Sequence, residues 1–149
     1  MKIKNEHITK GFILSGLMNI LGVLIFSRIF SNAFIPEFDN QAMSNFGLLM
    51  IVLWGFVFIA VSKSFHKVKW VVAVFTIEKL IYATHWTKWI TTNNLTDVLE
   101  KDKMAGIYYA IYGINDWIFF AFFLFVFIRL SRKKLAGARL QRLPLLGNL

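Results

Sequence analysis

Five polar or charged residues lie near the middle of long apolar segments, and they carry most of the chemistry that this sequence offers. They are Asn19, Glu78, Lys79, Asn115 and Asp116. Carboxylate, ammonium and amide groups are costly to place among apolar side chains, so their similar depth in three segments predicts one shared polar layer. Such a layer can bind a cation, exchange protons, or hold helices together through an ion pair between Lys79 and Asp116.

Ionisable and aromatic side chains extend this layer along one face of the segment 70–90. Glu78, Tyr82, His85 and Trp89 follow one another at intervals of four, three and four residues. This spacing puts side chains on one face of an α-helix. We therefore expect a polar stripe that begins at the middle of this helix and continues toward its end.

A second stripe is expected on the segment 105–128, where Tyr109, Tyr112 and Asp116 share a helical face. The two stripes predict a polar half-cavity that opens toward the outer side and is closed by apolar residues on the other. The expected ligand-binding residues are Asn19, Trp54, Glu78, Lys79, Tyr82, His85, Tyr112, Asn115 and Asp116. We expect the Asn19 amide to bind Asp116 or Glu78.

Several chemistries are excluded by residues or motifs that the sequence lacks. The chain has no cysteine, which excludes disulfides, thiolate metal sites and thiol enzymes. It also lacks a glycine-rich phosphate loop, His-Glu-x-x-His and Gly-x-Ser-x-Gly. Glu78 and His85 lie about 10 Å apart along the helix axis, which disfavours joint metal ligation. We therefore expect no metal and no cofactor.

The apolar segments are long enough to cross a membrane. Of the 149 residues, 57% are hydrophobic and 17% are charged, against about 25% charged in an ordinary soluble domain. A hydrocarbon core is about 30 Å thick, and a helix satisfies its own backbone groups inside it. The expected spans are 11–30, 46–62, 70–90 and 105–128. We predict an all-α fold, a single domain over 1–149 that forms an integral membrane four-helix antiparallel bundle.

The distribution of basic residues predicts the orientation of this bundle. The formal net charge is +9, and Lys and Arg concentrate in the segments 1–10, 63–69 and 129–149. The loops 31–45 and 91–104 carry more acidic than basic residues. Basic loops stay on the cytoplasmic side, so both termini are expected in the cytoplasm. We expect the protein in the cytoplasmic (inner) membrane of a bacterium, with an uncleaved first span.

The basic tail 129–149 has two interpretations. It alternates basic residues with leucines, as a segment lying on anionic lipid would, or it is a solvated extension of the last helix. A nucleic-acid partner is not expected, because no basic soluble domain remains once the spans are removed.

Two further sets of residues are expected to serve packing and anchoring. The residues Trp70, Trp86, Trp89 and Tyr108 are expected in the aromatic belts at the membrane interfaces. A seam of small or polar residues is expected to let another helix approach the first span, and it consists of Gly11, Ser15, Asn19 and Gly22.

The leading functional hypothesis is a non-enzymatic membrane protein that binds a small amphipathic or cationic molecule, or protons, in the polar cavity. Transport by a chain with four spans would require a homo-oligomer. One alternative is an intramembrane enzyme that acts on a lipophilic substrate with Glu78 or Asp116 as general acid/base. Another is an accessory or assembly subunit that pairs with a partner membrane subunit, where the polar layer only fixes helix register. The sequence leaves these alternatives open.

Overall fold

The computed structural model describes the backbone of residues 4–146 and the side chains of residues 4–132. Within this range the chain is helical and contains no strand, which confirms the predicted all-α class. The helices are α1 (Asn5–Phe26), α2 (Phe34–Phe38), α3 (Asn45–Val61), the 3-10 helix η1 (Phe65–Lys67), α4 (Lys69–Thr92), α5 (Leu95–Lys101) and α6 (Lys103–Leu146).

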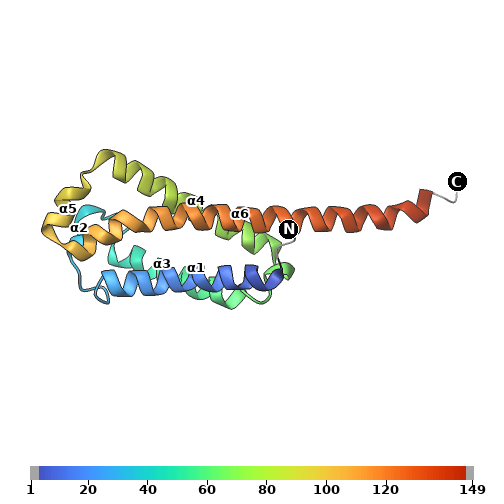
Figure 1. The fold of residues 1–149 in the computed structure, drawn as a ribbon, viewed down its shortest axis with the longest axis horizontal. Coiled ribbons are helices and arrows are strands. Elements are labelled where there is room, and N and C mark those ends of the chain that lie inside the picture. Colours follow the sequence, from blue (N-terminus) through green and yellow to red (C-terminus); the bar gives the residue numbers. More distant parts are fainter. Residues whose placement is uncertain (1–3, 147–149) are drawn as a thin grey trace.

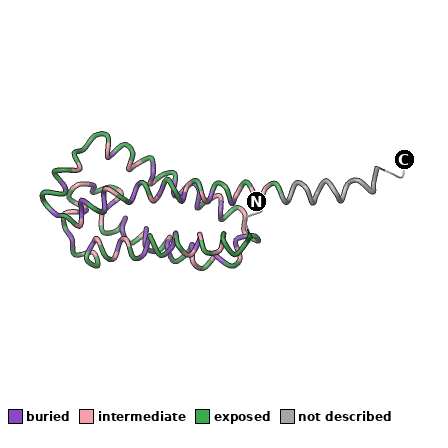
Figure 2. Tube along the Cα trace, viewed as in Figure 1, coloured by how far each residue is buried: buried purple, intermediate pink, exposed green. Residues whose placement is uncertain are grey.

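The four long helices pack as two pairs. Helix α1 packs against α3, α4 packs against α6, and α1 also contacts α6. The short helices α2 and α5 lie at one end of the molecule, while the start of α1 and η1 lie at the other (Figure 1). Consecutive long helices therefore run in opposite directions. Figure 2 shows that buried residues recur along the inner faces of these helices and that exposed residues lie outside.

Two of these helices are long and apolar enough to cross a membrane, namely α1 and the part of α6 from Lys103 to Arg132. Helix α3 is apolar but has 17 residues. Helix α4 is less apolar because it carries Glu78 and Lys79 within its length. In the predicted basic tail 129–149, the backbone continues as part of helix α6 to Leu146. The tail's side chains from residue 133 onward lie outside the described residues.

Helix α1 ends at Phe26, four residues earlier than the predicted span 11–30. The next residues, Arg28, Ile29 and Phe30, have φ values of 50°, 55° and 65°, which no α-helix can continue. The Ser27 hydroxyl accepts a hydrogen bond from the Phe30 N–H at 2.9 Å. This side chain offers the backbone an alternative to the helix, which explains the early end.

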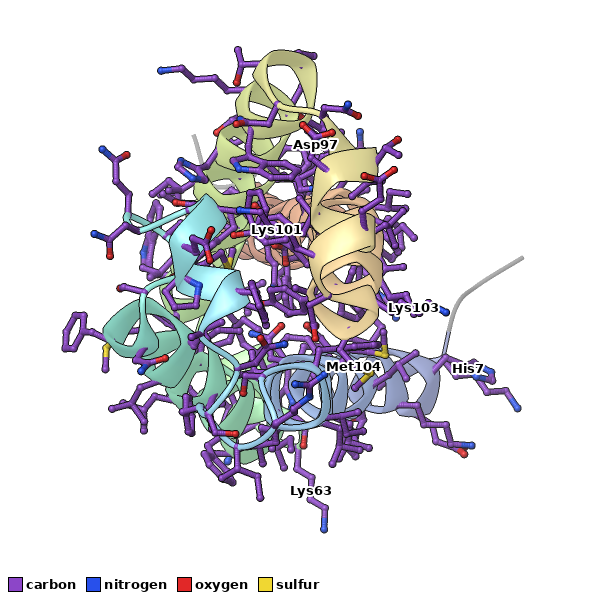
Figure 3. All side chains as sticks on the ribbon, turned by 90° about the vertical axis from the view of Figure 1, so that its left-hand side faces the viewer. His7, Lys63, Asp97, Lys101, Lys103 and Met104 are labelled. Carbon is purple, nitrogen blue, oxygen red and sulfur yellow. The ribbon has the colours of Figure 1, made fainter. Side chains whose placement is uncertain are left out.

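Asp102 joins the α1–α2 connection to the start of α6. Its carboxylate accepts hydrogen bonds from Arg28 at 2.7 Å, from the Asn32 amide at 3.0 Å and from the Ala105 N–H at 2.8 Å. The last of these caps the N-terminus of α6. Burial raises the pKa of Asp102, but the three donors outweigh burial and hold this pKa below its usual value. Figure 3 views the molecule from this end, where Asp97, Lys101 and Lys103 are labelled.

Two glycines allow α1 and α3 to approach closely. A Cβ added at Gly55 would lie 2.8 Å from the Gly16 carbonyl oxygen, and one added at Gly16 would lie 2.5 Å from the Gly55 carbonyl oxygen. Two residues of the predicted seam also lie at close contacts: Asn19 Cβ is 3.1 Å from the position of a Cβ added at Gly55, and a Cβ added at Gly11 would meet the Phe122 ring of α6. At Gly22, which the seam included, an added Cβ would have no atom within 4 Å.

The buried apolar residues form two clusters. The cluster toward η1 is rich in phenylalanine and includes Phe12, Phe58, Phe75 and Phe123. The cluster toward α2 and α5 is rich in tyrosine and tryptophan. On α1, α4 and α6 the predicted polar residues fall between the residues of these two clusters. The polar layer is therefore enclosed between two apolar regions.

Candidate ligand-binding site

A buried ion pair occupies the centre of the polar layer. The side chain of Lys79 on α4 is 1% exposed. Its Nζ donates a hydrogen bond to Asp116 Oδ1 on α6 at 2.6 Å and another to Asn19 Oδ1 on α1 at 3.0 Å. The sequence-based hypothesis of a Lys79–Asp116 pair is therefore confirmed. Both partners are desolvated, so the pair depends on its direct contacts.

Asn19 extends this network to α3, beyond the helices α1, α4 and α6 that the hydrogen bonds of Lys79 join. Its Nδ2 donates to the backbone carbonyl of Ile51 on α3 at 3.2 Å. The prediction that Asn19 binds Asp116 or Glu78 was wrong. An amide has both an acceptor and donors, and in this position the acceptor meets an ammonium group while a donor meets a helix carbonyl. One connected set of hydrogen bonds thus links α1, α3, α4 and α6.

Glu78 lies beside this network without joining it through a hydrogen bond. Its Oε1 is 3.8 Å from Lys79 Nζ. Among the described residues, neither carboxylate oxygen of Glu78 has a hydrogen-bond partner, although both atoms are buried. Buried polar atoms are nearly always paired, so this carboxylate has an unused capacity to accept a proton or a donor. Two carboxylates share one ammonium group here.

A groove between α1 and α6 reaches this layer. It has a volume of about 380 Å³, and its polar lining consists of Asn19, Tyr112, Asn115 and Asp116. The hydroxyl of Tyr112 is buried and has no hydrogen-bond partner among the described side chains. The apolar walls come from Leu14, Leu17, Met18, Leu21, Gly22, Val23, Ile25, Phe26, Ile51, Tyr108 and Ile111. The groove therefore combines a long apolar wall with polar groups on α6.

Tyr82 and His85 line a different hollow, which lies against the start of α3. This hollow has a volume of about 340 Å³ and is otherwise lined mainly by residues 41–50. His85 Nε2 lies 2.7 Å from Asp39 Oδ2. Asp39 also accepts hydrogen bonds from the backbone N–H groups of Gln41 and Ala42. Asp39 was missed from the sequence because nothing local shows that the 39–44 turn folds back onto α4.

Aromatic residues of α4 and α6 pack together on the α5 side of the polar layer. Trp89 stacks on Tyr109 with ring centroids 4.2 Å apart, and its Nε1 donates to the Phe38 carbonyl. Tyr108 stacks on Tyr112 at 5.3 Å. The two hollows near the polar layer lie between neighbouring helices. Trp89 and Tyr108 are buried, so their prediction as interfacial belt residues was wrong.

Trp54 is separated from both hollows. Its ring packs against Phe58 and Phe75, with centroids 6.3 Å and 6.2 Å away, in the phenylalanine-rich cluster. Of the nine predicted site residues, the structure joins Asn19, Lys79 and Asp116 directly by hydrogen bonds. Among the described residues no group of three or more His, Asp or Glu side chains could hold a metal ion.

Comparison with known proteins gives no further assignment. The chain matches no protein-family model, no curated protein and no solved structure.

Proposed function

We propose that this protein is a four-helix antiparallel bundle of the bacterial inner membrane that binds a small amphipathic molecule with a cationic head group. The apolar part of this ligand would lie in the α1–α6 groove, and the head group of the ligand would contact the polar layer. Both termini would face the cytoplasm. The observation that carries this proposal is the groove, whose apolar walls lead to the buried carboxylate of Asp116.

The exposed surface supports a membrane location for all four long helices. Helices α3, α4 and α6 have large apolar side chains on their outer faces, such as Phe56 (56% exposed), Ile77 (56%) and Ile118 (60%). On α1 the exposed apolar side chains, such as Leu21 (49%), line the α1–α6 groove. Among the side chains that the structure describes, in contrast, the most buried charged one is that of Lys79. Extensive apolar surface is unfavourable in water, whereas hydrocarbon accommodates it. This arrangement supports a lipid surrounding.

The ends of the molecule support the proposed orientation. The end that contains η1 and the start of α1 carries Lys63, Lys67 and Lys69, together with Arg129 of α6. The opposite end carries the basic residues of α5 and its neighbours beside several carboxylates. The positive-inside rule assigns the more basic end to the cytoplasm.

The charge balance of the layer favours a cationic head group or a proton. When all three groups are ionised, Glu78 and Asp116 outnumber Lys79 by one negative charge. Tyr112 lines the groove, and its buried hydroxyl has no hydrogen-bond partner among the described residues, so it can donate or accept a further hydrogen bond. A cationic ligand would compensate the excess charge, and the aromatic ring of Tyr112 could contact a cation through its face.

Native mass spectrometry of the protein purified in a mild detergent tests the proposal. We expect a small-molecule adduct on the wild type that is lost from Glu78→Gln/Asp116→Asn. The matched control is Asp97→Asn/Glu100→Gln, which removes the same charge from exposed residues at the α5 end and should retain the adduct.

A second pair of variants tests the groove without altering the ion pair. Gly22→Phe should fill the groove and remove the adduct, because an added side chain at Gly22 enters open space. Gly22→Ala adds one methyl group and should leave the adduct in place. An equal absence of adduct from every variant and from the wild type would contradict ligand binding and would favour the role of an assembly subunit.

A further inference from the structure

We propose that a second, basic hollow binds the phosphate head group of an anionic phospholipid from the cytoplasmic leaflet. This hollow lies where α1 begins, η1 passes into α4, and α6 leaves the packed helices. Its volume is about 500 Å³, and its lining is Asn5, His66, Lys67, Val68, Lys69, Trp70, Val71, Arg129 and Leu130. The inference goes beyond the α1–α6 groove and rests only on the proposed membrane orientation.

The charge of the lining selects an anion. Lys67, Lys69 and Arg129 bring permanent positive charge to one hollow, and no described lining residue carries a carboxylate. His66 also lines the hollow, and its imidazole ring can donate a hydrogen bond to a phosphate oxygen. Arg129 donates to the Asn5 side chain at 3.2 Å, and both residues line the hollow. Clusters of this kind attract anionic lipid head groups.

The surroundings of the hollow favour a lipid over a soluble anion. Trp70 is 70% exposed, and Lys69 Nζ lies 4.7 Å from the centre of its ring. Exposed tryptophan is typical of the membrane–water interface. From Trp70 the exposed apolar residues Val71, Val74 and Ile77 continue along α4. An acyl chain could follow these residues while its phosphate lies among the lysines, whereas a free phosphate would gain nothing from them.

Lipid retention measured by native mass spectrometry tests this assignment. The full-length protein would be incubated with equal amounts of phosphatidylglycerol and phosphatidylcholine that carry the same acyl chains. We expect the wild type to retain phosphatidylglycerol preferentially. In Lys67→Gln/Lys69→Gln the ratio of bound phosphatidylglycerol to bound phosphatidylcholine should fall at least about fivefold. Each basic residue near the surface strengthens the binding of anionic lipid by about this factor.

The control is Lys101→Gln/Lys103→Gln, which removes two exposed lysines from the opposite end and should keep the preference. Unchanged helical content by circular dichroism verifies that each variant is folded. Equal retention of the two lipids by the wild type, or equal losses in both double variants, would overturn the assignment. Displacement of the lipid by millimolar inorganic phosphate would also overturn it, because the hollow would then be a site for a soluble anion.

Discussion

Lys79 Nζ lies 2.6 Å from Asp116 Oδ1, although the two residues are 37 positions apart in the chain and belong to different helices. The contact connects α4 and α6 at the level where the two apolar clusters meet. Since both side chains are buried, either partner would be poorly solvated if the other were lost. The stability of the helix packing should therefore depend on the pair remaining complete.

Lys79→Met should destabilise the protein strongly. The substitution leaves the carboxylates of Glu78 and Asp116 buried without their shared ammonium group, and removing one partner of a buried ion pair typically costs about 3–5 kcal/mol. Lys79→Met/Asp116→Leu should recover part of this loss, because it removes one stranded charge. The free energy of unfolding in detergent, followed by circular dichroism, measures both changes.

Lys88→Met is the matched control, since Lys88 lies on the same helix and is exposed. It should change the unfolding free energy by less than about 0.5 kcal/mol, as surface substitutions generally do. A similar small effect of Lys79→Met would show that the buried pair does not stabilise the packing.

Asp102 should make the stability depend on acidic pH. Its pKa is lowered in the folded protein by the donors that surround it, against the opposing effect of burial. A group with a lowered folded pKa contributes stability above its unfolded pKa, which is about 3.9 for aspartate. This contribution of Asp102 is lost as the pH falls from the unfolded pKa of about 3.9 through the lower pKa of Asp102 in the folded protein.

Asp102→Asn should therefore be less stable than the wild type at neutral pH, and the difference should shrink below about pH 4. Melting temperatures recorded between neutral pH and about pH 3 measure this. Glu37→Gln serves as the comparison, because Glu37 forms an exposed ion pair with Lys101 at 2.7 Å. A constant difference between wild type and Asp102→Asn across this range would contradict the prediction.

Gly55→Leu should separate α1 from α3. The new Cβ would lie 2.7 Å from Ile20 Cγ1 and 2.8 Å from the Gly16 carbonyl oxygen, so the helix backbones must move. Overpacking of this kind costs about 1–3 kcal/mol. Gly22→Ala is the matched control in the same helix pair, and it should be neutral or stabilising by up to about 1 kcal/mol because alanine favours helix. Equal melting temperatures for the two variants would contradict this prediction.

The positions of the helices and the depth of the polar residues could be predicted from the sequence. Hydropathy located all four long helices, and the 1.5 Å rise per residue placed Asn19, Lys79 and Asp116 at a common level. The rise does not fix which helices are neighbours or how each is rotated. The partners of Asn19, which are the Lys79 ammonium group and the Ile51 carbonyl, were therefore missed.

The loops and aromatic residues were harder to predict for a related reason. Trp89 and Tyr108 have the residue types of an interfacial belt, but α2 and its connections supply partners that bury them. The contacts of Asp39 with His85 and of Asp102 with Arg28 join segments far apart in the chain. No local pattern specifies such contacts, because they depend on how the two helix pairs come together.

The proposed orientation predicts opposite labelling of two exposed lysine positions. The chain has no cysteine, so single cysteines can be introduced without removing others. Lys103 begins α6 at the α5 end, whereas Lys63 lies in the segment before η1, and both side chains project away from the packed helices (Figure 3). In intact bacterial cells permeable only at the outer membrane, a membrane-impermeant maleimide should label Lys103→Cys. Lys63→Cys should react only after the inner membrane is broken, because the proposed orientation places the basic end in the cytoplasm. Labelling of both variants in intact cells, or recovery of the protein from the soluble fraction, would contradict the proposed membrane topology.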